Sequence, residues 1–93
     1  MSVTVVLPSQ LRELNQGRGA IDLGNGADTV GAVFEELRAR APAVWDRIFT
    51  ERRELRPHVN VFVGMDDIRW SGGLATPVAD GDEVVVLPSV SGG

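Results

Sequence analysis

Cysteine and lysine are both missing from this sequence of 93 residues. Without cysteine the chain can form no disulfide, no thiolate metal site and no thiol nucleophile. All nine basic residues are arginine, so no side-chain amine is present to form an isopeptide bond with another copy. No apolar run approaches the roughly 20 residues that span a bilayer, and no signal-peptide pattern is present. We therefore expect a cytoplasmic protein without a membrane partner.

The net charge and the length of the chain narrow the possible classes of protein further. A net charge of −4 argues against a nucleic-acid partner, because nucleic acids attract proteins chiefly through their phosphates. An apolar fraction of 43% is that of a globular chain. We expect one small domain over residues 1–93, ending in a flexible tail at residues 89–93.

Two short strands are predicted near the start. In residues 2–8, apolar side chains alternate with a period of two, which is typical of a half-buried strand. Residues 19–24 give a second strand. The loop between them has room for one helical turn.

One main helix follows the turn sequence GNGAD at residues 24–28. Asp28 or Thr29 can cap it, and Pro42 ends it. A second short helix is predicted over residues 43–50. The apolar residues that recur at helical spacing in the main helix are Val30, Val33, Phe34, Leu37 and Ala41.

The second half of the chain predicts strands at residues 58–63 and 84–88, with a short edge strand at residues 68–70. The order strand, strand, helix, strand, short strand, strand indicates an α+β domain. It fits the β-grasp arrangement, a mixed sheet of four or five strands packed on one main helix plus a short second helix. The last strand is then central, which suits its run of valines.

Alternation assigns the two faces of this sheet. Val3, Val5 and Leu7 should face the helix together with Val59, Val61 and Val63. Thr4, Val6, Asn60 and Phe62 then face outward. For the last strand, alternation allows either Val84 and Val86 or Val85 and Leu87 to face outward.

The chain ends in SVSGG, and this ending carries chemistry. Glycine has no Cβ, so such a segment is thin enough to enter a narrow channel. A terminal carboxylate is a poor acyl donor and needs activation, for example as an acyl-adenylate made with ATP. The phosphate-binding pattern GxxxxGK[ST] is absent, so the activating enzyme must be another protein.

The stretch DGDEVVVLPSVSGG at residues 80–93 resembles the C-terminus of the MoaD/ThiS family of ubiquitin-like sulfur carriers. LREL at residues 11–14 resembles the segment after their first strand. Within residues 58–84, RWSGGLAT is similar to the CysO-type members, which serve cysteine biosynthesis. The resemblance implies a β-grasp fold in which Val85 and Leu87 face outward.

The resemblance also implies a mechanism. An E1-like enzyme of the MoeB/ThiF type adenylates the Gly93 carboxylate, and a sulfur donor such as a rhodanese-type persulfide converts it to a thiocarboxylate. In the CysO-type pathway this sulfur attacks an aminoacrylate on the pyridoxal phosphate of a cysteine synthase. A JAMM-type zinc metalloprotease then releases cysteine. ATP and pyridoxal phosphate belong to these partners, and the chain itself is expected to bind no cofactor.

The same resemblance assigns the site residues. Gly93 carries the reaction, and Gly92 and Ser91 keep the tail thin. An exposed apolar patch beside the tail would bind partners. The expected partner-binding residues are Ser91, Val90, Pro88, Leu87, Val85, Phe62 and Val6.

Other functions stay open at this stage. The ending also suits a MoaD-type subunit of molybdopterin synthase, a ThiS-type carrier, a modifier conjugated to lysines of other proteins, or a non-covalent interaction module. No catalytic constellation is present, so an enzyme is not expected. We interpret His58 as structural or surface, Asp66 and Asp67 as solvated turn residues, and Trp45 and Trp70 as packing residues.

Overall fold

The computed structural model describes residues 2–24 and 26–88. Its strands are β1 (Thr4–Val6), β2 (Ala20–Asp22), β3 (Val59–Val63), β4 (Asp66–Asp67) and β5 (Glu83–Pro88). Its α-helices are α1 (Ser9–Arg12), α2 (Val30–Arg40) and α3 (Pro42–Ile48), with short 3₁₀ helices η1 (Glu13–Asn15), η2 (Ile68–Trp70) and η3 (Gly73–Ala75). None of the helices in these ranges is both long and apolar enough to cross a membrane.

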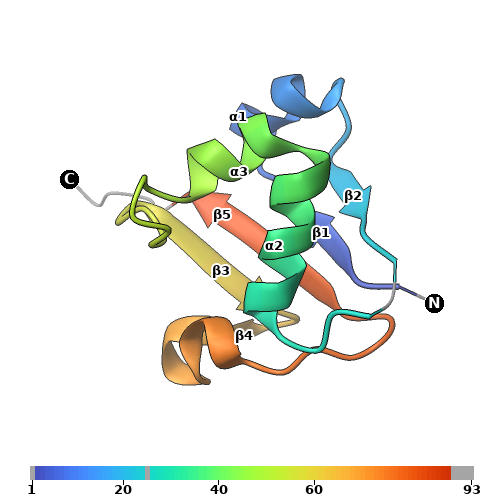
Figure 1. Ribbon diagram of the computed structural model, residues 1–93, viewed down its shortest axis with the longest axis vertical. Coiled ribbons are helices and arrows are strands. Elements are labelled where there is room, and N and C mark those ends of the chain that lie inside the picture. The colour runs from blue at the N-terminus through green and yellow to red at the C-terminus, as the bar shows by residue number, and fades with distance from the viewer. Residues whose placement is uncertain (1, 25, 89–93) are drawn as a thin grey trace.

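The five strands form one mixed sheet in the order β2-β1-β5-β3-β4. The last strand, β5, runs parallel to β1 and antiparallel to β3, so it lies in the centre of the sheet (Figure 1). This is the predicted β-grasp arrangement, with its two N-terminal strands, crossing helix and returning strands. A central last strand places the end of β5 at one end of the sheet, beside the start of β3.

Helix α2 forms where its sequence pattern predicts it. Thr29 is the N-cap, and its Oγ1 accepts a hydrogen bond from the Ala32 N–H at 3.2 Å. The helix ends at Arg40, with Ala41 as its C-cap, and Pro42 starts α3, because proline is tolerated in a first helical turn but not in a helix interior. The side chains of α2 that the structure buries are Val30, Val33, Phe34 and Leu37.

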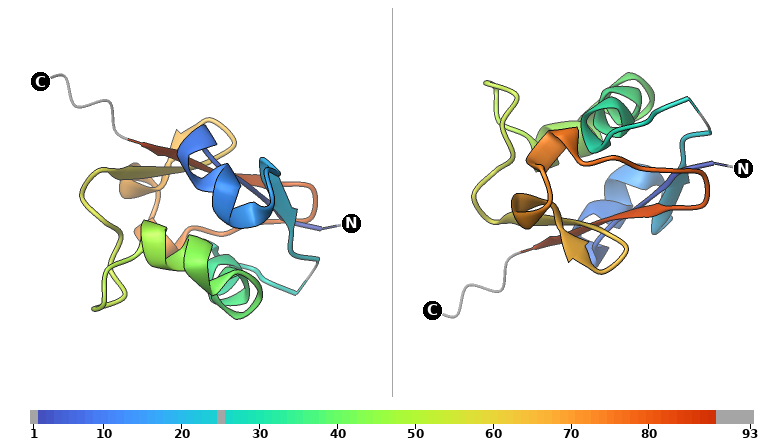
Figure 2. Two further views of the ribbon diagram at one scale, coloured as in Figure 1. Left: turned by 90° about the horizontal axis from the view of Figure 1, so that it is seen from above. Right: turned by 90° about the horizontal axis from the view of Figure 1, so that it is seen from below.

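The core lies between the sheet and the helices. Helices α2 and α3 cover the same face of the sheet, and no helix of the described ranges covers the opposite, outer face (Figure 2). Val5 and Val61 contribute buried side chains from the sheet. Phe49 stacks on Trp45 at a centroid distance of 5.0 Å and meets Phe34 edge to face at 5.1 Å, so aromatic contacts tie α2 to α3.

Two predictions about residues 64–71 are wrong. Residues 68–70 form η2 rather than an edge strand, because the β3–β4 hairpin places the pairing residues at Asp66 and Asp67. In a strand, Ile68 and Trp70 would share a face, but the 3₁₀ turn separates them. Ile68 is buried, whereas Trp70 is 85% exposed and is therefore not a packing residue.

Asp67 holds the start of η2. Its Oδ1 accepts a hydrogen bond from the Arg69 N–H at 2.9 Å, and its Oδ2 lies 2.8 Å from the Arg69 Nη2. The Arg69 side chain and then its backbone N–H hold the pKa of the Asp67 carboxyl below its ordinary value of 3.8. Of the two aspartates predicted to be solvated, Asp66 is exposed, whereas Asp67 is paired with Arg69.

This pKa gives a testable expectation. The pKa of Asp67 is lower in the folded state than in the unfolded state. The charged carboxylate therefore stabilises the fold at pH values above the ordinary pKa, and this stabilisation is lost as the pH falls through the folded-state pKa. Carboxyl-carbon NMR titration should give Asp67 a pKa below 3.8, and Arg69→Ala should return it toward that value. An Asp67 titration that Arg69→Ala leaves unchanged would refute this origin of the shift.

Candidate functional site

The outer face of the sheet carries a row of apolar side chains on adjacent strands. Val85 on the central strand pairs with Val6 of β1 on one side and with Phe62 of β3 on the other. Leu87 lies two residues further along β5, hence on the same face, and is 43% exposed. We call these four residues the outer-face patch: Val6, Phe62, Val85 and Leu87.

The burial of β5 decides which alternate residues face outward. Val84 and Val86 are fully buried, whereas Val85 is half-buried and Leu87 is exposed. The orientation that the family resemblance implied is therefore confirmed. That partners bind to these residues remains a prediction.

A groove lies at the end of β5, where the described part of the chain stops. Its volume is about 300 Å³, and strands β3 and β5, helices α1 and α3 and the short connections beside β1 and β3 contribute to it. Leu87 belongs both to this groove and to the outer-face patch. We call it the β5-end groove; the residues that line it are Pro8, Gln10, Leu11, Arg47, His58, Val59, Val86, Leu87 and Pro88.

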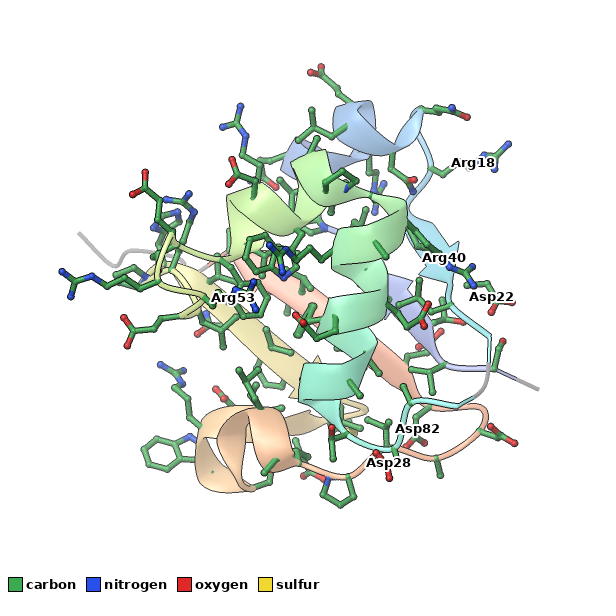
Figure 3. The ribbon with its side chains drawn as sticks, in the orientation of Figure 1. Arg18, Asp22, Asp28, Arg40, Arg53 and Asp82 are labelled. Atoms are coloured by element: carbon green, nitrogen blue, oxygen red, sulfur yellow. The ribbon has the colours of Figure 1, made fainter. Side chains whose placement is uncertain are left out.

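Charge is distributed unequally along β5. Arg47 and His58 line the groove at the end of the strand. Asp28 and Asp82 lie near the start of the strand, at the opposite end of the sheet (Figure 3). The β5-end groove therefore combines an apolar lining with the Arg47 guanidinium, which favours an anionic or acidic neighbour.

The edge strand β2 is partly covered. The Arg40 Nη1 donates to the Asp22 carbonyl oxygen at 3.2 Å, and Figure 3 shows these two residues beside one another. The Asn15 side-chain amide donates to the Ala20 carbonyl oxygen at 3.4 Å. Since both carbonyls have partners within the protein, this edge offers less free backbone to another chain than its position suggests.

The predicted tail residues Val90, Ser91, Gly92 and Gly93 lie outside the described residues. Pro88 is the last described residue, and it lines the β5-end groove. The carboxyl-terminal segment thus continues from a point beside both the groove and the outer-face patch. The outer-face patch and the β5-end groove therefore meet at the last described residues of β5.

Little in the sequence indicates the β5-end groove. Pro8, Leu11 and Arg47 come from separate elements that only the folded chain brings together. The LREL motif, which includes Leu11, was the one available signal. His58 is exposed, as predicted for a surface residue, and lines the groove. Across residues 2–24 and 26–88 no cluster of side chains could hold a metal ion.

The chain belongs to the ThiS family, whose model matches residues 5–93. It is a small sulfur carrier protein with the ubiquitin-like β-grasp fold. Among curated proteins, it is 40% identical to the sulfur carrier protein CysO of Mycobacterium tuberculosis over 95 residues, with both chains fully covered.

Solved structures agree with this assignment. The crystal structure of Mycobacterium tuberculosis CysO has a TM-score of 0.82 at 39% identity, covering 95% of this chain and 99% of that one. CysO in the Amycolatopsis orientalis BexX/CysO complex has a TM-score of 0.85 at 34% identity, covering 99% and 100%. Small archaeal modifier protein 3 of Haloferax volcanii is also related, with 40% identity over 65 residues, or 70% of each chain.

Proposed function

We propose that this protein carries sulfur as a thiocarboxylate on Gly93 and supplies it for cysteine biosynthesis. The observation that carries the proposal is the full-length similarity to CysO. The family match also extends through the terminal Gly92 and Gly93. The chain contributes a reactive end group on a stable scaffold, and its partners contribute the catalysis.

The loading step uses the Gly93 carboxylate as its substrate. In an E1-like enzyme of the MoeB/ThiF type, a carboxylate oxygen attacks the α-phosphorus of ATP, and pyrophosphate leaves. Hydrosulfide, or a persulfide domain of rhodanese type that replaces it, then attacks the acyl carbon. With hydrosulfide, a C–S bond forms, the C–O bond to AMP breaks and one proton is released, which leaves the thiocarboxylate.

The outer-face patch and the β5-end groove are the surfaces that we assign to these partners. Both adjoin Leu87 and Pro88, so an enzyme that takes up the terminal residues must approach across them. Val6, Phe62 and Val85 offer apolar area, and Arg47 suits an acidic rim on the enzyme. The BexX/CysO structure is a complex of a related carrier with another protein and supports partner binding in general.

The later steps follow the CysO analogy and take place in the cytoplasm. A cysteine synthase that contains pyridoxal phosphate accepts the sulfur, and a JAMM-type zinc metalloprotease releases the product. Pyridoxal phosphate supplies an electrophilic acceptor when it is bound to that partner. The carrier binds neither this cofactor nor ATP by itself.

Leu87 provides a test of the partner surface. Leu87→Glu should lower kcat/KM of the E1-like enzyme for the carrier about tenfold, because it places a charge in a desolvated contact. The matched control is Leu14→Glu in η1, since Leu14 is 40% exposed against 43% for Leu87 and lies outside both the patch and the groove. Equal loss in both variants would remove Leu87 from the interface.

Conjugation to proteins is the second candidate function. It is favoured by the similarity to small archaeal modifier protein 3. The chain lacks lysine, so conjugates would form on other proteins and not as chains of this one. Mass spectrometry of cell extracts distinguishes the two functions, because a modifier leaves Gly93 linked to lysines of many proteins.

A further inference from the structure

An exposed tryptophan lies far from the end of β5 at Pro88. Trp70 is 85% exposed and Met65 is 94% exposed. Val59 of β3 pairs with Pro88, whereas Val63, at the other end of β3, pairs with Val84. The segment that carries Met65 and Trp70 follows Val63, beside β4 (Figure 1). It therefore lies at the opposite end of β3 from the β5-end groove.

The exposure of Trp70 is a property of the folded segment. Ile68 anchors η2 in the core with 1% exposure. The Ser71 N–H donates to the Ile68 carbonyl oxygen at 3.1 Å, and the Ser71 Oγ donates to the Asp67 carbonyl oxygen at 3.4 Å. The Thr76 Oγ1, which lies 3.3 Å from the Ser71 Oγ, donates to the Gly73 carbonyl oxygen at 2.7 Å. These contacts fix the backbone on both sides of Trp70, so little further ordering is needed for binding.

A hollow of about 330 Å³ lies beside this tryptophan, and we call it the Trp70 hollow. Its apolar walls come from Phe62, Met65 and Trp70, and its polar atoms come from Asp66, Asp67 and Ser71. The Asp67 carboxylate is already paired with Arg69 at 2.8 Å. Asp66 is exposed and has no ion pair among the residues that the structure describes. The hollow thus offers an aromatic ring and one available carboxylate.

The Trp70 ring and the Asp66 carboxylate favour a positively charged side chain, and the apolar walls favour apolar residues beside it. Tryptophan is the aromatic side chain that binds cations best, and a neighbouring carboxylate adds a charge pair. Arginine fits better than lysine, because its planar guanidinium can stack on the ring while its N–H groups reach the carboxylate. A cation–π contact also occurs within this protein, where the Arg38 guanidinium carbon lies over the Trp45 ring, 5.1 Å from its centre.

We propose that the Trp70 hollow binds an arginine side chain on an apolar loop of a partner protein, stacked on Trp70 and paired with Asp66. Apolar residues flanking that arginine contact Met65 and Phe62. The hollow and the β5-end groove lie at opposite ends of β3, but Phe62 belongs both to the hollow and to the outer-face patch, so this partner would compete with an enzyme that covers the patch. The proposal does not depend on the sulfur chemistry at Gly93.

A peptide titration followed by NMR tests this inference on the full chain. The probes are acetyl-Gly-Leu-Arg-Leu-Gly-amide and the same peptide with citrulline, which keeps the shape of arginine without its charge. The Trp70 indole N–H signal should shift saturably with the arginine peptide. The citrulline peptide should bind about fivefold more weakly, as expected from the loss of a cation–π contact and an ion pair.

Two variants make the result specific. Trp70→Ala, followed by the backbone N–H signals of Met65 and Ser71, should show no saturable binding, and Asp66→Asn should weaken binding about threefold. Asp80→Asn is the matched control, because it removes the same charge from an exposed aspartate outside the hollow and should leave the affinity unchanged. Equal affinity for both peptides, or equal weakening by Asp80→Asn, would overturn the proposal. So would a Trp70 signal that shifts with the concentration of the protein alone, since a second copy would then occupy the hollow.

Discussion

Removal of Gly92 and Gly93 is expected to abolish thiocarboxylate formation while the fold remains intact. The truncated chain still ends in a carboxylate, but at Ser91 it lies about 7 Å short of its former reach, at roughly 3.3 Å per residue. Ser91 also brings a Cβ to the position where glycine leaves space for a narrow channel. The measurement is the intact mass after incubation with ATP, sulfide and the E1-like enzyme.

The fold should survive this truncation, because the hydrophobic core that the structure describes within residues 2–24 and 26–88 is complete before Pro88. Urea unfolding of the truncated and full-length chains should therefore give the same free energy. Sulfur incorporation by the truncated protein would contradict the assignment of the reaction to Gly93. A large loss of stability would instead show that the terminal residues support the scaffold.

Phe34→Ala is expected to cost about 3–5 kcal/mol of unfolding free energy, the largest effect on stability that we predict. Phe34 is 1% exposed and packs edge to face on Phe49, so its removal leaves a cavity between α2 and α3. The total free energy of unfolding of a small domain is about 5–15 kcal/mol. The variant should therefore be partly unfolded or close to unfolding at physiological temperature.

Met65→Ala is the control for this stability measurement. Met65 is 94% exposed, and its truncation should change the unfolding free energy by no more than about 0.5 kcal/mol. Urea denaturation monitored by circular dichroism gives both values. A cost below about 1 kcal/mol for Phe34→Ala would mean that the cavity collapses and that this aromatic contact is not central to the core.

Local patterns predicted the elements whose signals lie within a few residues. The helical spacing of Val30, Val33 and Leu37 and the stop at Pro42 located α2. Alternation in the strands identified the buried faces of β1 and β3. The choice between Val84 and Val85 as outward residues needed the family resemblance, because a strand of consecutive valines gives alternation no contrast.

The features that were not predicted lie in segments too short to show a pattern or depend on contacts between residues far apart in the sequence. Residues 68–70 are too few to distinguish a strand from a 3₁₀ turn, and the Asp67 hydrogen bond to the Arg69 N–H decides the outcome. The β5-end groove joins residues as distant as Pro8 and Pro88, and no local pattern reports such a contact. The exposure of Trp70 was not predicted, because the apolar character of a tryptophan side chain favours burial and no local pattern indicates otherwise.

The most direct test of the account is the intact mass of the full-length protein after incubation with ATP, sulfide and an E1-like enzyme. We predict a mass gain equal to the exchange of one oxygen for one sulfur, with the change located at Gly93 by fragmentation. The gain should require ATP. An unchanged mass with an enzyme that loads a related carrier, or sulfur found at any other residue, would contradict the account.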